Sequence, residues 1–103
     1  MGLGVSQGVV EGVARVVTSP AQFDDVKKGE ILVCIMTNPA WVVLFTKIAG
    51  LVTDSGGALS HPAVVSREFE IPAVVGTIEA TQQIKTGQRL RVDGTNGTVQ
   101  ILG

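Results

Sequence analysis

The sequence predicts one mixed α/β sandwich, and three observations carry this prediction. At 103 residues the chain has room for a single hydrophobic core, so we expect one domain over residues 1–103. Apolar residues make up 45% and charged residues 17%, which is typical of a globular protein. Valine-rich stretches alternate with helix-like segments in the middle of the chain, while both ends favour strands.

The first third of the chain predicts a strand, a short helix and a second strand. Residues 9–17 alternate valine with other side chains, as a strand does. Ser19-Pro20 predicts a helix start, with serine as cap, and we expect that helix to end at Lys27-Lys28-Gly29. Residues 31–35 form an apolar run typical of a strand buried on both faces. The single cysteine, Cys34, lies in this run, so we expect it to be buried and without a disulfide.

A second helix is predicted between Thr37-Asn38-Pro39 and Gly50. Its apolar side chains recur at i, i+3, i+4 and i+7, so they share one helical face. These side chains are Trp41, Leu44, Phe45 and Ile48. We expect this face to be core rather than a ligand site.

The second half of the chain continues the alternation and closes with a hairpin. The expected elements are a strand over residues 51–53, a helix over 62–69, a strand over 71–76, a small helix over 78–84, and strands over 90–92 and 98–102. Asp93-Gly94-Thr95-Asn96-Gly97 between the last two strands is a hairpin signal. It lacks the later ligands of a calcium loop, so we expect a turn.

The only histidine, His61, lies where a glycine-containing loop enters a predicted helix. Gly56-Gly57 lets the backbone approach a ligand closely, although a plain turn is the alternative. Free N–H groups and the helix dipole favour an anion at this place. Imidazole is a good nucleophile near neutral pH. Together these features indicate a side chain that accepts, carries and releases a phosphoryl group.

Three further polar residues have two interpretations each. Ser60 suits a helix cap, its simpler role, or a donor to a phosphate oxygen. Arg67 lies six residues beyond His61 and is not on the same helical face, so it suits either a phosphate or partner's ligand, or a surface position paired with a nearby acid. Asp54 suits either an orienting partner of the histidine or an ordinary loop acid.

Two segments carry a resemblance to a known family. They are residues 53–61, Thr-Asp-Ser-Gly-Gly-Ala-Leu-Ser-His, and residues 71–76, Ile-Pro-Ala-Val-Val-Gly. Both resemble the swivelling phosphohistidine domain of enzymes that use phosphoenolpyruvate, among them phosphoenolpyruvate synthase, pyruvate phosphate dikinase, enzyme I of the sugar phosphotransferase system and rifampicin phosphotransferase. Weaker likenesses to the family's opening segment and closing hairpin extend the match to nearly the whole chain. They lie at Gly4, Ser6, Gly8, Gly12 and Asp93-Gly94-Thr95.

The resemblance implies a β/β/α swivelling phosphohistidine-domain sandwich. His61 takes the position of the phosphorylated residue, and family members usually use its Nε2 atom. In such enzymes the domain rotates between an ATP-grasp nucleotide-binding domain and a second catalytic domain. A phosphoryl group would then reach His61 from an ATP-grasp partner, or from phosphoenolpyruvate, and pass to an acceptor such as pyruvate or another small molecule. The expected phosphate-site residues are Gly56, Gly57, Ser60 and Arg67.

Cofactors are expected on a partner rather than on this chain. The sequence has no cluster of acids suited to hold a metal, so Mg²⁺ and ATP would belong to the partner domain. No nucleotide motif such as a P-loop is present, so we expect the chain to be the phosphocarrier part of a phosphotransferase that is inactive alone. The rival interpretation is a non-catalytic interaction or regulatory domain that keeps the fold.

Two residues depart from the family pattern. Leu59 stands where dikinases and synthases commonly have threonine, which some dikinases phosphorylate for regulation, so we expect no such regulation here. Leucine is closer to the rifampicin phosphotransferase pattern, which weakens an assignment to pyruvate. Pro62 replaces a common alanine, and proline is tolerated early in a helix.

Charge and hydropathy exclude several partners. Net charge is −1 and there is no basic cluster, which argues against nucleic acid and anionic membranes. The longest apolar run, residues 39–45, is far shorter than a membrane span. The N-terminus has no signal-peptide pattern, so we expect a cytoplasmic location.

Overall fold

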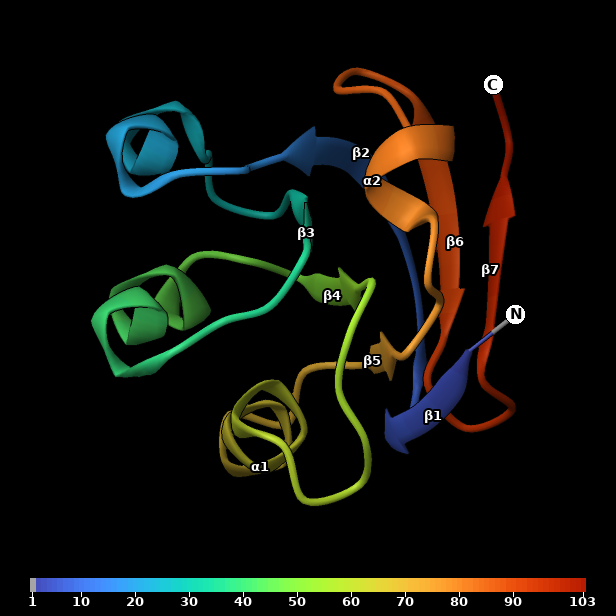
Figure 1. Cartoon of the computed structure of the whole chain (residues 1–103). Helices are drawn as coiled ribbons and strands as arrows, with labels where there is room; N and C mark the ends of the chain where they lie inside the picture. The colour runs from blue at the N-terminus through green and yellow to red at the C-terminus, as the bar shows by residue number, and fades with distance from the viewer. Residues whose placement is uncertain (1) are drawn as a thin grey trace.

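The computed structural model describes residues 2–103 and arranges them in three layers, shown in Figure 1. One sheet of seven strands has the order β1-β5-β4-β3-β2-β6-β7. In chain order the elements are β1 (Leu3–Ser6), β2 (Val9–Val16), the 3₁₀ helix η1 (Pro20–Asp25), β3 (Ile31–Cys34), the 3₁₀ helix η2 (Pro39–Thr46), β4 (Gly50–Thr53), α1 (His61–Glu68), β5 (Ala73–Val75), α2 (Ala80–Gln83), β6 (Arg89–Asp93) and β7 (Thr98–Ile101).

The centre of the sheet is parallel and its ends are antiparallel. β2, β3, β4 and β5 pair in parallel, with Val33 opposite Val52 in the middle. β1 joins β5 antiparallel at one edge, and the β6–β7 hairpin joins β2 antiparallel at the other. β2 belongs to both parts, because residues 9–13 pair with β6 and residues 14–16 pair with β3. The sheet therefore turns at β2, and the hairpin lies across the central strands (Figure 1).

Each face of the parallel strands has its own apolar core, which confirms the predicted α/β sandwich. One core lies between the strands and the helices η1, η2 and α1, and it contains the predicted stripe of Trp41, Leu44, Phe45 and Ile48. The other lies between the strands and the β6 layer, and α2 contributes Ala80 to it. Both faces of β3 are buried, as its continuous apolar run predicts, and both faces of β4 are buried as well.

The two helices before β4 differ from the sequence prediction. η1 ends at Asp25 rather than at Lys27-Lys28-Gly29, although Ser19 caps it as predicted and accepts the Ala21 N–H at 3.3 Å. η2 is also a 3₁₀ helix rather than an α-helix. Over only eight residues a stripe at i, i+3 and i+4 fits three residues per turn nearly as well as 3.6, so the pattern could not separate the two. No strand was predicted at Leu3–Ser6, a short edge segment with only two large apolar residues.

The predicted hairpin is confirmed, and its glycines have a second role. β6 and β7 pair with Leu90 opposite Ile101. A Cβ on Gly94 would lie 1.8 Å from the Ser6 carbonyl oxygen, so only glycine allows the turn to pack on β1. The Asp-Gly signal thus fixes a tertiary contact as well as a turn. Along residues 2–103, no helix is both long enough and apolar enough to cross a membrane.

An ion pair beside β3 gives a prediction about acid stability. Arg15 donates from Nε and Nη2 to the Glu30 carboxylate at 3.1 and 2.9 Å, and the Lys27 N–H donates to it at 2.7 Å. Burial alone would raise the pKa of Glu30, but these donors and the positive charges of Arg15 and Lys27 outweigh it and hold the pKa below its ordinary value.

We expect Glu30→Gln to destabilise the fold by about 1 kcal/mol at neutral pH. A lowered pKa stabilises the folded state fully above about pH 4.5, and this contribution disappears as the pH falls through the folded-state value. Urea unfolding of both proteins from pH 7 to pH 3 should therefore show the difference shrinking below about pH 4.5. A difference that stays constant across this range would contradict the assignment.

Candidate functional site

Three loops meet at the carboxyl ends of β3, β4 and β5. Because the strands are parallel neighbours, these ends lie at one edge of the sheet, where open α/β folds place their ligands. Backbone hydrogen bonds join the loops: the Ser55 N–H donates to the Ile35 carbonyl at 2.9 Å, and the Ile78 N–H donates to the Asp54 carbonyl at 2.8 Å. The loops therefore form one connected surface, and His61 begins the helix that follows the middle loop.

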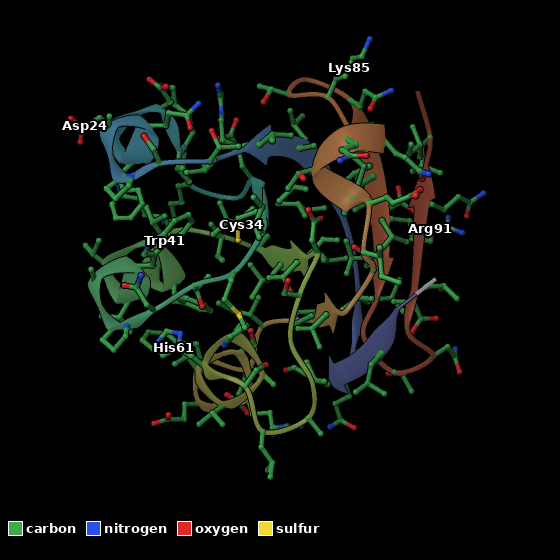
Figure 2. The ribbon with its side chains drawn as sticks, in the orientation of Figure 1. Asp24, Cys34, Trp41, His61, Lys85 and Arg91 are labelled. Carbon is green, nitrogen blue, oxygen red and sulfur yellow. The ribbon has the colours of Figure 1, made fainter. Side chains whose placement is uncertain are left out.

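His61 is the first residue of α1, one residue before the predicted helix start, and its ring is held on one side. Its Nδ1 atom and the Thr37 hydroxyl are 2.7 Å apart, and Thr37 is only 3% exposed. The His61 and Phe45 rings pack edge to face, with their centroids 6.4 Å apart and their planes at 80°. Figure 2 shows the histidine between α1 and η2. The hydrogen bond with Thr37 engages Nδ1 and leaves Nε2 outside it.

Ser60 precedes the helix, but its side chain does not cap it. The Ser60 hydroxyl donates to the Gly57 carbonyl at 2.7 Å instead, and makes no hydrogen bond to a helix N–H. The predicted cap is therefore wrong, because the glycine turn brings a carbonyl acceptor within reach of the hydroxyl. The N-terminus of α1 keeps its N–H groups free of a side-chain cap, which suits an anion.

The two glycines of the motif have different surroundings. Gly56 has a φ of +115°, and a Cβ there would lie 2.8 Å from the Ser60 hydroxyl oxygen. Gly57 has ordinary backbone geometry, and nothing lies within 4 Å of the position that a Cβ would take. The turn thus requires glycine at the first position, while the second leaves open space beside the loop.

Asp54 and Arg67 are not brought together with His61. Both carboxylate oxygens of Asp54 are used by Thr81, at 2.9 Å from its N–H and 2.5 Å from its hydroxyl, so Asp54 is a loop acid that holds the start of α2. Arg67 lies in the last turn of α1, at the far end of the helix from His61. Its Nε donates to the Val5 carbonyl at 2.6 Å, and neither interpretation offered above described this contact. The placement does not support Arg67 as a ligand of a phosphate on His61.

Thr37 is the site residue that the sequence analysis missed. The sequence Thr37-Asn38-Pro39 was interpreted only as a helix start, and Asn38 indeed caps η2 through its hydrogen bond with the Ala40 N–H at 2.9 Å. The usable signal was a polar residue just beyond a buried parallel strand that neighbours the strand leading to His61. Cys34, at the end of that strand, is fully buried as predicted. Burial, together with the charge of Asp54, raises the pKa of its thiol to about 12.

Comparison with known proteins identifies the family. Residues 26–97 match the family described as PEP-utilising enzyme, mobile domain. The chain belongs to this family. It is 51% identical over 102 residues to a rifampicin phosphotransferase of Streptomyces sviceus and 51% identical over 98 residues to a phosphoenolpyruvate synthase of Pyrococcus furiosus. These matches cover 99% and 95% of the chain but only 12% of each relative, so in the relatives this domain is part of a much longer protein.

Solved structures agree with the assignment. An enzyme I protein studied by NMR superposes with a TM-score of 0.67 and 33% identity, over 78% of this chain and 33% of that one. Aconitase X of Thermococcus kodakaraensis gives a TM-score of 0.74 at 21% identity over 99% of this chain and 96% of that one, which shows a shared fold alone. The predicted swivelling-domain fold is therefore confirmed.

The different surroundings of the two glycines can be tested by stability alone. Gly56→Ala should destabilise the fold by about 1–3 kcal/mol, because alanine is strained at a positive φ and its methyl group would meet Ser60. Gly57→Ala is the matched control and should change stability by less than about 0.5 kcal/mol. Chemical denaturation measures both. Equal losses at the two positions would show that the turn is not built as described.

Proposed function

We propose that this domain is a phosphohistidine carrier. His61 accepts a phosphoryl group from an ATP-grasp partner and passes it to a small-molecule acceptor held by another domain. The observation that carries the proposal is the state of the imidazole: Nδ1 is held by the buried Thr37, while Nε2 stays available at the uncapped start of α1. Membership of the mobile-domain family supports the same role.

The reaction uses the two nitrogens of the ring in different ways. Nε2 attacks the phosphorus atom of the donor, so the Nε2–P bond forms while the bond between phosphorus and the leaving oxygen breaks. The proposal requires the ring proton on Nδ1, so that Nδ1 donates to the Thr37 hydroxyl oxygen 2.7 Å away and this contact stabilises the positive charge that the ring gains. In the second half the acceptor attacks phosphorus, and the electron pair of the Nε2–P bond returns to Nε2.

Charge neutralisation must come from elsewhere. Phosphoryl transfer depends on positioning and on positive groups around the transferred phosphate. The three loops around His61 contain no lysine or arginine, and Asp54, on the loop that leads to His61, is hydrogen-bonded through both carboxylate oxygens to Thr81. Within residues 2–103, no three His, Cys, Asp or Glu side chains are grouped as a metal site requires. These residues do not fit Mg²⁺, so we assign the metal–nucleotide complex to the partner.

The relatives indicate, by analogy, which chemical classes of molecule accept the phosphoryl group. Rifampicin phosphotransferases and phosphoenolpyruvate synthases match the chain at similar identity, so identity alone does not separate a drug-like acceptor from pyruvate. Leu59, which resembles the rifampicin phosphotransferase pattern, favours the first class.

The carrier role predicts a single, acid-labile modification. Incubation with an ATP-grasp domain of a phosphoenolpyruvate-utilising enzyme, Mg²⁺ and labelled ATP should place the label on His61, where a phosphoramidate is lost in acid and survives in base. His61→Ala should abolish labelling, and the chain without the donor domain should hydrolyse no ATP. Acid-stable label, or label on the His61→Ala variant, would overturn the proposal. Tight binding of the donor domain without any transfer would favour the interaction-domain alternative.

Thr37 should act as a positioning residue for His61. We expect Thr37→Val to keep the fold but to slow phosphorylation about tenfold to a hundredfold, since a hydrogen bond to a charged group contributes about 1.5–3 kcal/mol. Thr37→Ser keeps the hydroxyl and should recover most of the rate. Imidazole ¹⁵N shifts provide a readout that packing alone would not move: the Nδ1–H tautomer should lose population in the valine variant only. Equal behaviour of valine and serine would contradict the role.

A further inference from the structure

Four exposed apolar side chains project from the three loops that meet at His61. They are Ile35 and Met36 after β3, Leu59 after β4, and Ile78 after β5, with exposed fractions of 52%, 38%, 90% and 78%. We call these four residues the collar. Backbone hydrogen bonds join Ile35 and Ile78 to residues 54–55, and Met36 lies close to Gly56, so these three collar residues flank the loop that carries Leu59. Exposed apolar groups gathered at one site mark an interaction surface more often than scattered ones do.

Ile78 carries an additional sign of function. Its φ is +76°, a conformation that β-branched residues rarely adopt, and it holds its side chain 78% exposed. The hydrogen bond from its N–H to the Asp54 carbonyl fixes this conformation. Asp54 is itself tied to Thr81 through both carboxylate oxygens. Strain of this kind clusters at functional sites. Folding gives no reason for an isoleucine here, because its side chain packs little.

The electrostatics of the site indicate what the collar binds. Before phosphorylation the four collar side chains carry no charge, and the three loops contain no lysine or arginine. Their two acids are already hydrogen-bonded within the domain, Asp54 by Thr81 and Glu79 by the Gln83 side chain. Few charges are therefore free for recognition of the unloaded domain, and burial of apolar surface supplies most of the affinity. After phosphorylation the site bears negative charge, and a cationic surface on the acceptor side can attract it. The need for apolar contact is thus greatest in the loading step.

We infer that the collar is the docking surface for the phosphoryl-donor domain, with Leu59 and Ile78 as its main contacts. The inference rests on the proposed carrier function and names the surface that serves it. The domain spans 12% of the length of these relatives, so each relative is about eight times as long as the domain. Each relative therefore holds a protein partner for it within the same chain. The donor surface would be apolar at its rim, to meet the collar, and cationic at its centre, to hold the transferred phosphate.

The test separates docking from chemistry by using two donors. Phosphoramidate is a small donor that needs no docking surface, whereas the ATP-grasp domain with Mg²⁺ and ATP does. Leu59→Ser and Ile78→Gly should each raise the KM for the donor domain about fivefold to tenfold, leave kcat within twofold, and leave loading by phosphoramidate unchanged. Val9→Ser is the control: it removes an apolar side chain that is 58% exposed at the start of β2, beside Gly8, which packs on Pro72 before β5, and it should change neither.

Ile78→Gly has a further diagnostic value, because glycine relieves the strain at φ +76°. This variant should unfold at a higher temperature than the unmodified chain while being loaded less well by the donor domain. A loss of loading therefore could not be ascribed to a loss of folded protein.

The other possible results of this experiment would overturn either the collar as the docking surface or the carrier function itself. Unchanged KM in both collar variants, or an equal rise in Val9→Ser, would overturn the collar as the docking surface. Normal loading with slowed discharge would assign the collar to the acceptor domain and overturn the inference as stated. If phosphoramidate loads the unmodified chain but the donor domain does not, the inference is likewise overturned. Failure of phosphoramidate to modify His61 at all would count against the carrier function itself, not against the collar alone.

Discussion

The parallel pairing of β3, β4 and β5 is the constraint on which the site depends. Parallel neighbours end at the same edge, so the pairing of Cys34 with Thr53 brings the loops after β3 and β4 to one place. Thr37 follows the first of these strands and His61 follows the second, which is why residues 24 positions apart can meet at 2.7 Å. A one-residue slip between β3 and β4 would turn the apolar side chains of each strand to the opposite face and would also separate this pair.

The layered packing of the sheet explains both why the strand ends beneath the site are held rigidly and why the loops above them stay exposed. Both faces of the central strands are covered, one by helices and the other by the β6–β7 layer, so the strand ends cannot shift without disturbing two cores. The loops are then joined by backbone hydrogen bonds rather than by apolar packing. This division suits the proposed carrier role, because His61 stays fixed in the domain while the surface around it remains free for contact.

Much of the fold could be predicted from the sequence, because the strong signals are local. Within a few residues, the apolar run of β3 indicates a strand, the stripe of η2 indicates a helix, and Asp93–Gly97 indicates a turn. The motif around His61 was equally local. What could not be predicted depends on contacts between distant segments. Thr37 meets His61 only after two strands have paired, and Arg67 bonds to Val5 only after β1 has joined the sheet edge. Ser60 failed as a cap because the preceding turn offered a nearer acceptor.

The buried cysteine has a practical consequence for studies of motion. Cys34 is the only thiol of the chain, is fully buried, and with a pKa of about 12 remains protonated at neutral pH. Maleimide and thiol-directed nitroxide reagents react with accessible thiolates, so Cys34 should not react with them. A cysteine introduced on an exposed strand would then be the sole attachment point for a fluorophore or spin label. The proposed movement of the domain between partners could then be tested by distance measurements without first removing a core residue.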